Sequence, residues 1–152
     1  GTGSVPLLTS SFNGHTAVAA ALLAARADAT GPRDALGMTA LHHAGLRGHA
    51  TVIYMLVAAR VDVSARDMEQ RSPLHLAAHG FEDVDDQRFG IRSARDANLE
   101  AVRALLVVRA ELDHVDCHGL VAAHYAQTKG HPLVQKLLLD VREAEYDVGN
   151  KL

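Results

Sequence analysis

Histidine is the residue type in this sequence that most directly suggests chemistry, because ten histidines occur among 152 residues. A neutral imidazole can bind a metal ion or transfer a proton near neutral pH. The densest local group combines His114, Asp116, Cys117 and His118, which are all zinc-ligand types. Their spacing matches no recurrent zinc motif. We therefore expect a solvated turn here and predict no metal site.

Most of the other histidines recur at fixed intervals, which indicates a structural role. Helices of successive repeat units pack roughly 8–10 Å apart, whereas zinc ligands lie about 2 Å from the metal. Neighbouring members of one set therefore cannot share an ion. We expect each imidazole to bond a nearby hydroxyl or backbone group and to connect one turn to the next. Six histidines form two such sets: His42, His75 and His124 in one, and His15, His49 and His131 in the other.

Nucleophilic catalysis has one candidate pair, Cys117 beside His118. Adjacent side chains on an extended turn point in different directions, and a catalytic thiolate needs a positioned base and a donor-lined pocket. The sequence shows no phosphate-binding glycine loop and no pair of carboxylates in a recognisable catalytic context. We predict no catalytic residue, no enzyme activity and no cofactor.

The pattern that places the histidines has a period of 33 residues. The segment Met-Thr-Ala-Leu-His at 38–42 returns as Arg-Ser-Pro-Leu-His at 71–75, and Asp34 returns at Asp67. A fixed period of this size indicates stacked structural units. We assign a single domain, 5–149, preceded by a linker or expression remnant at 1–4. Its units lie at about 5–33, 34–66, 67–115 and 116–149, with an insertion at 80–95 in the third.

Each unit is expected to contain two helices. The second helix carries apolar residues four, five, eight and nine places after the Gly-His position, as at Val52, Ile53, Leu56 and Val57. This spacing gives one apolar stripe, which only a neighbouring unit can cover. The first helix is rich in small residues, as expected where helices pack closely.

Turn and cap residues support the same assignment. Thr39 and Ser72 stand where an N-cap is needed, directly before the first helix. Gly37 and Gly119 stand where a tight turn requires positive φ, and Gln70 occupies the equivalent place. We therefore expect the turn at Gln70 to be strained or differently shaped.

The segment from Asp34 to His42, followed by Gly-His at 48–49, resembles the ankyrin repeat. The copy at 67–78 is nearly as close, and those at 116–126 and 5–15 are weaker. The resemblance implies an all-α, ankyrin-type α-solenoid of stacked helix-turn-helix repeats with short β-turn or hairpin connectors and a concave binding face.

The second unit departs from the family pattern at two places. His43 stands where the family usually has a buried leucine, and Gly45 stands where it usually has alanine. We expect this unit to pack more loosely than the others.

Composition limits the partners and the compartment. A net charge of −3 provides no overall field for nucleic acid or an anionic membrane. No apolar run approaches the ~20 residues of a membrane span, so we predict no membrane insertion. The lone Cys117 fits a reducing compartment, which favours an intracellular, cytoplasmic or nuclear location. The first unit lacks its own turn, so we expect the chain to be part of a longer protein.

The insertion at 80–95 is the one break in the period, and structureless loops of this length are often functional. Its first half is acidic and its second half is basic. Two readings stay open: a solvated loop whose charges pair with one another, and a contact with a partner. The candidate residues are Phe81, Asp85, Asp86, Arg88 and Phe89.

We predict a non-catalytic scaffold that binds a protein or peptide on the concave turn-and-inner-helix surface. The alternative is a substrate-recruiting or inhibitory segment of a larger enzyme whose catalytic domain lies outside this chain. Apolar turn residues with no structural task favour a protein or peptide ligand, and the ends of the first helices, such as Phe12, add to this surface. The candidate partner-binding residues are Leu36, Met38, Arg47, Met68, Glu69, Arg71, Cys117, His118 and Leu120.

Overall fold

The computed structural model describes residues 4–81 and 93–149. Four insertion candidates, Asp85, Asp86, Arg88 and Phe89, lie outside these residues. The described residues form helices and no strand, which confirms the predicted all-α class. The helices are α1 (Ser4–Asn13), α2 (Thr16–Ala24), α3 (Ala40–Leu46), α4 (Ala50–Ala58), α5 (Pro73–His79), α6 (Ser93–Val107), α7 (Ala122–Thr128) and α8 (Pro132–Gly149).

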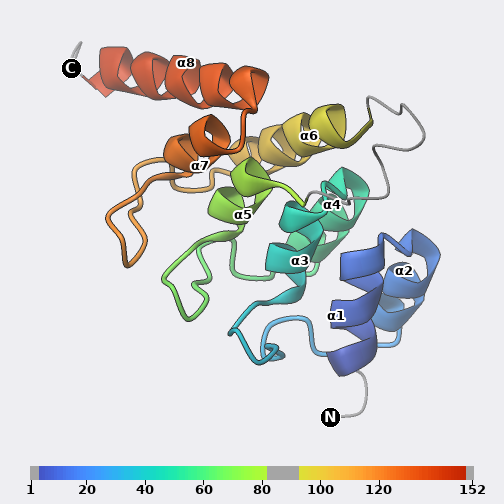
Figure 1. Cartoon of the computed structure of the whole chain (residues 1–152). Coiled ribbons are helices and arrows are strands. Elements are labelled where there is room, and N and C mark those ends of the chain that lie inside the picture. The colour runs from blue at the N-terminus through green and yellow to red at the C-terminus, as the bar shows by residue number, and fades with distance from the viewer. Residues whose placement is uncertain (1–3, 82–92, 150–152) are drawn as a thin grey trace.

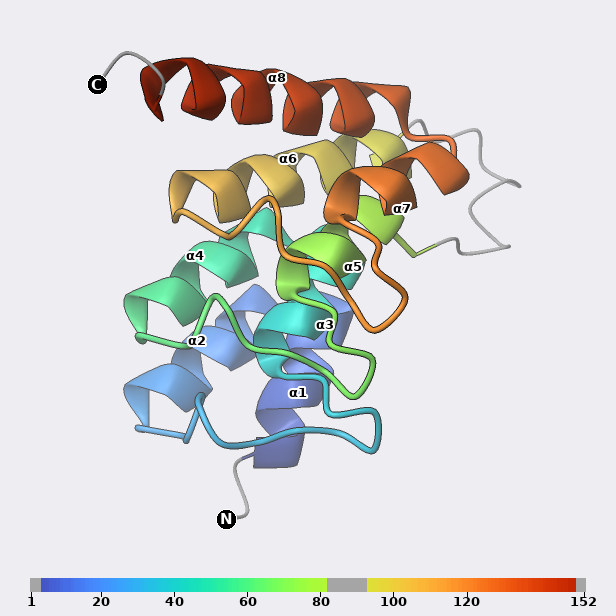
Figure 2. The same ribbon diagram turned by 90° about the vertical axis from the view of Figure 1, so that its left-hand side faces the viewer.

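The helices stack in two layers. The first helices of the units, α1, α3, α5 and α7, pack in that order and form the inner layer. The second helices, α2, α4, α6 and α8, pack behind them as the outer layer (Figure 1). The connectors between units form hairpin loops that project beyond the inner layer (Figure 2). Among the described residues, no helix is both long enough and apolar enough to cross a membrane.

The core lies between the layers and is built from the first helices, as at Leu41 and Leu74, and from the predicted stripes of the second helices. Val52, Ile53 and Leu56 of α4 are fully buried, and α6 buries the equivalent residues. Two stripe residues differ: Val18 and Leu139 are exposed, because they belong to the first and last units, where a neighbour covers less of the helix. The last residues assigned to the insertion, 93–95, are helical, since α6 begins at Ser93.

The predicted N-caps are present. Thr39 Oγ1 accepts the backbone N–H of His42 at 3.4 Å, and the Thr39 N–H donates to His42 Nδ1 at 3.2 Å. Ser72 and His75 form the same reciprocal pair at 3.4 and 3.3 Å. Pro73 follows at the first helical position, where its missing N–H costs nothing.

The other ring nitrogen of these histidines joins neighbouring units. Because Nδ1 accepts a backbone N–H, Nε2 carries the proton and donates to a carbonyl of the next turn. The histidines of the Gly-His set reach back to the preceding inner helix in the same manner. The bonds run from His42 to Arg71 O (3.0 Å), His75 to Leu120 O (3.1 Å), His49 to Phe12 O (3.1 Å) and His131 to His79 O (3.2 Å). Of the six histidines for which a structural role was predicted, these four are confirmed, and His124 Nδ1 accepts the backbone N–H of Val121 at 3.1 Å.

The expectation of loose packing in the second unit is wrong at Gly45. A Cβ placed on Gly45 would lie 2.9 Å from the Pro73 carbonyl oxygen and 3.6 Å from Ala77 Cβ. The missing side chain therefore lets α3 and α5 approach closely, and the departure from alanine marks a tight contact. His43 is mostly covered as well, and its Nε2 lies 3.0 Å from Asp34 Oδ2.

The hairpin of the third unit is strained, as expected from its sequence. Gln70 has a φ of 61°, close to the 76° and 74° of Gly37 and Gly119 in the other hairpins. This left-handed conformation raises the free energy of a residue with a side chain, whereas glycine adopts it without that cost.

Replacing Gln70 by glycine should therefore raise the free energy of unfolding by about 1 kcal/mol. Urea denaturation followed by circular dichroism measures the change. Glu69→Gly is the matched control, because Glu69 is also exposed on the same hairpin but is not in the left-handed conformation. The control should lose stability, and a loss with Gln70→Gly as well would contradict the strain.

Candidate protein-binding face

Each hairpin is organised by an aspartate at its first residue. Asp34 Oδ1 accepts the N–H groups of Leu36 and Met38, both at 2.9 Å. Asp67 and Asp116 accept the two equivalent N–H groups of their own hairpins at 2.8–2.9 Å. The recurrence of aspartate with the repeat period therefore reflects its role in closing the turn.

The hairpins are also bonded to one another. The Met68 N–H donates to the Leu36 carbonyl, and the Cys117 N–H donates to the Glu69 carbonyl, both at 3.0 Å. The Arg33 guanidinium adds a bridge by donating to the carbonyls of Gly37 at 2.8 Å and Arg66 at 2.6 Å. The successive hairpin tips therefore form a preorganised ladder, and binding to it would order little backbone.

Three of the predicted apolar residues are exposed on this ladder. Leu36, Met68 and Leu120 have 57%, 73% and 38% of their surface accessible. Cys117 and His118 lie on the same hairpins and are exposed too. We name Leu36, Met68 and Leu120 the hairpin apolar set.

Met38 does not belong to this set, and the expectation that it is free on the surface is wrong. Its side chain is only 4% exposed. The Met38 carbonyl accepts the Asp34 N–H at 3.0 Å, so this residue closes the hairpin next to the first turn of α3. Its side chain is therefore buried against the array while the tip residue Leu36 stays outside.

Arg71 and Glu69 are partly engaged within the chain. Arg71 Nε donates to Asp67 Oδ2 at 2.8 Å, and its Nη1 lies 3.1 Å from Glu69 Oε2. The Arg71 side chain is 18% exposed, whereas half of the Glu69 side chain is accessible. A partner can reach Glu69 more readily than Arg71.

At the far end of the inner helices, two aromatic rings hold a guanidinium. Arg47 Cζ lies 4.9 Å from the centre of the Phe12 ring and 4.4 Å from that of Phe81. The two rings meet edge-to-face at 5.8 Å, and Phe12 contacts His43 in the same way at 5.6 Å. Phe81 remains 39% exposed. We name Phe12, Arg47 and Phe81 the aromatic–arginine stack.

The stack includes one residue of the insertion, for which a solvated loop and a partner contact were both left open. Phe81, the first aromatic residue of the insertion, packs onto the array, and only part of its surface remains accessible to a partner. Sequence reasoning named all three residues of the stack but did not pair them, because they come from three different units. Tyr125 was missed: its hydroxyl donates to Asp116 Oδ2, and its ring contacts His75 and His79.

The histidine–cysteine turn is held by other bonds. His114 Nε2 donates to the Gln70 carbonyl at 3.0 Å, and its ring meets His75 edge-to-face at 5.8 Å. In residues 4–81 and 93–149, no three histidine, cysteine, aspartate or glutamate side chains converge as metal ligands do. His114 therefore acts as one more connection between hairpins.

Comparison with known proteins agrees with this architecture. A family model described as ankyrin repeats (3 copies) matches residues 3–85, which is more than half of the chain. A curated relative, the transient receptor potential cation channel subfamily A member 1 homolog of Caenorhabditis elegans, is 31% identical over 111 residues. That match covers 68% of this chain, and the chain spans only 9% of the relative's length.

Proposed function

The chain belongs to the ankyrin repeat family, whose repeats are general protein–protein interaction modules, and on that premise we propose that it binds a partner protein or peptide across its hairpin tips and inner layer. Ankyrin repeat domains are typically non-catalytic, which agrees with this role. The channel activity in the relative's name belongs to that protein, of which this chain matches a small part.

The observation that carries the proposal is the exposure of the hairpin apolar set on a bonded ladder. The side chains of Leu36, Met68 and Leu120 are exposed, and their backbones lie on successive hairpins joined by hydrogen bonds. Apolar side chains held in fixed positions on an exposed surface are typical of binding sites. A partner would gain apolar burial there without ordering a flexible loop.

The aromatic–arginine stack lies at the opposite ends of the inner helices from the hairpins and also supports the proposed binding face. Arginine and aromatic residues are the types most often found at interface hot spots. The stack lies at the C-terminal ends of α1 and α3 and directly after α5, whereas the hairpins precede α3, α5 and α7. A ligand lying along the inner helices can touch both groups of residues.

The test is affinity capture from a lysate of the source organism with a triple variant, Leu36→Glu, Met68→Glu and Leu120→Glu. We expect the variant to lose at least tenfold in captured partner, because a charge at the centre of an apolar contact must be desolvated. The matched control is Val18→Glu, Tyr54→Glu and Val107→Glu on the outer layer, where three exposed apolar residues are replaced with the same change in net charge.

Capture of the same partners by both triple variants would contradict a site on the hairpins. Circular dichroism should show equal helicity for the two variants, since all six side chains are exposed. Loss of capture in the outer-layer variant alone would move the site to the opposite face.

A further inference from the structure

Three outer-layer helices end in the same unusual way. Just past α2, α4 and α6, the residues Arg26, Arg60 and Arg109 adopt φ values of 59°, 62° and 61°. In each case the arginine N–H bonds a carbonyl three residues back, and the next N–H bonds a leucine carbonyl five residues back. A left-handed residue at this place in a helix end is usually glycine. We name Arg26, Arg60 and Arg109 the arginine edge.

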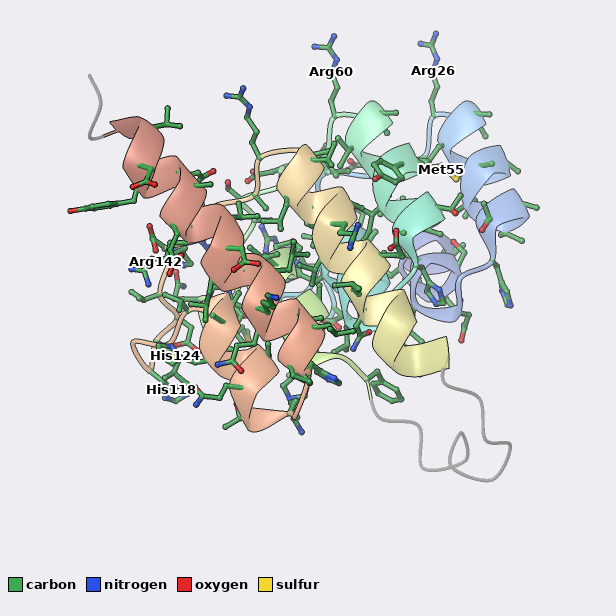
Figure 3. All side chains as sticks on the ribbon, turned by 90° about the horizontal axis from the view of Figure 1, so that it is seen from above. Arg26, Met55, Arg60, His118, His124 and Arg142 are labelled. Atoms are coloured by element: carbon green, nitrogen blue, oxygen red, sulfur yellow. The ribbon has the colours of Figure 1, made fainter. Side chains whose placement is uncertain are left out.

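The arginine edge forms a row along the array. Because α2 packs on α4 and α4 packs on α6, the three identical helix ends lie one unit apart. They occupy the side of the molecule away from the hairpin tips (Figure 2). Arg26 and Arg60 extend side by side away from the ribbon (Figure 3), and all three arginines are exposed.

The acids nearest in sequence are engaged elsewhere. Asp28 Oδ1 accepts the N–H groups of Thr30 and Gly31, and Asp62 Oδ1 accepts the N–H of Ser64. Glu111 Oε2 pairs with Arg66 at 2.6 Å. Within the part of the chain that the structure describes, no ion pair involves an arginine of the edge. These guanidinium groups therefore face solvent without a carboxylate partner from those residues.

The fold does not require arginine at these places. A cation is favoured near a helix C-terminus by the helix dipole, but an arginine within the last turn would gain that attraction without the left-handed strain. Glycine would end the helix at lower cost. An arginine in the left-handed conformation nevertheless occurs at this place in three units, and the three cations lie along one edge.

We propose that the arginine edge binds a linear acidic segment of a partner protein, with each arginine contacting one carboxylate. Packed helices lie roughly 8–10 Å apart, and carboxylates at every seventh residue of an α-helix lie about 10.5 Å apart. An acidic helix laid along the row therefore meets the arginines nearly in step. This surface is separate from the hairpin face and does not depend on the function proposed there.

The test measures binding of a fluorescent, alanine-rich helical peptide with glutamate at every seventh position. We expect binding at low ionic strength that weakens as salt is added. The triple variant Arg26→Gly, Arg60→Gly, Arg109→Gly should bind at least tenfold more weakly and should unfold at a higher temperature, because glycine relieves the strain. The triple arginine-to-lysine variant should keep most of the affinity. The matched control, Arg103→Gln, Lys129→Gln, Lys136→Gln, has the net charge of the glycine variant and should bind as the natural chain does.

Unchanged peptide binding by the glycine variant would overturn the proposal, and its folded state is assured by the expected gain in stability. Equal weakening by the glutamine control would also overturn it, because the attraction would then be an effect of net charge. Binding to vesicles of phosphatidylcholine with one third phosphatidylserine, in place of the peptide, would assign the edge to a membrane and refute the acidic protein segment.

Discussion

Gly80→Ala should lower the free energy of unfolding by roughly 4 kcal/mol, a large part of the 5–15 kcal/mol typical of a domain. A Cβ on Gly80 would lie 1.8 Å from Asn98 Nδ2, and Asn98 is only 5% exposed, so it has little room to move. Gly80 also has φ 67° and ψ 160°, a combination that is essentially restricted to glycine. Steric overlap and backbone strain therefore act together where α5 meets α6.

Gly130→Ala is the matched control for this prediction. Gly130 has a φ of 71°, but a Cβ there would meet nothing within 4 Å. It should therefore cost only about 1 kcal/mol, the left-handed strain alone. Urea denaturation of both variants measures the difference, and equal losses would show that the contact with Asn98 is unimportant. In an Asn98→Ala background, Gly80→Ala should cost less, because the overlap is gone while the strain remains.

The fold could be predicted from the sequence because its signals are local and repeated. Thr39 and Ser72 cap helices with the side chain of the third helical residue, and this interaction needs only neighbouring residues. His42 and His75 then complete the cap and reach the next turn. A motif that builds the same local structure in each unit fixes the stacking once the units are placed side by side.

The candidate face was predicted less completely, because exposure depends on how hairpins rest on the array. Leu36 and Met38 are both apolar and two residues apart, yet one lies outside and the other is buried. The closing hydrogen bond between Asp34 and Met38 decides this, and sequence alone does not show which hairpin residue forms it. The aromatic–arginine stack was likewise hidden, because it joins three units.

Two other features were visible in the sequence: one was misinterpreted and the other was not used. Gly45 suggested loose packing because it replaces a larger residue. In the structure, the Pro73 carbonyl oxygen occupies the space that a side chain at Gly45 would need. Arg26, Arg60 and Arg109 recur with the repeat, 34 and then 49 residues apart, as other motif residues do. Recurrence of an arginine where helix ends favour glycine was therefore a usable signal for the arginine edge.

Acid should destabilise this protein well above the pH at which carboxylates titrate. Burial lowers the pKa of His42 to about 4 from 6.5, against the opposing effect of its bond to the Arg71 carbonyl. Between these pH values the unfolded chain binds a proton that folded His42 does not, so the free energy of unfolding falls as the pH falls. At ~1.4 kcal/mol per pKa unit, His42 alone should remove about 3 kcal/mol between pH 6.5 and pH 4.

Three further histidines act in the same direction. Burial is the largest influence on His43, His49 and His75 and lowers the pKa of each. His42 and His75 must therefore stay neutral in the folded state, because the Nδ1 of each accepts a backbone N–H. Protonation of His42 or His75 places a hydrogen on Nδ1, which can then no longer accept the backbone N–H of the capping residue. The cap hydrogen bond is therefore broken.

Urea unfolding at several pH values between 7 and 4 measures the total effect, and His42→Gln isolates one part of it. That variant should be less stable at pH 7, since it loses the bond to Arg71, but its stability should fall less steeply with acid. An unchanged pH dependence would refute the assignment to His42. Nuclear magnetic resonance of the natural chain offers a reading that does not rely on a folded variant. The His42 ring should stay neutral down to about pH 4, and protonation near pH 6.5 would show that the connections between units do not depend on a neutral imidazole.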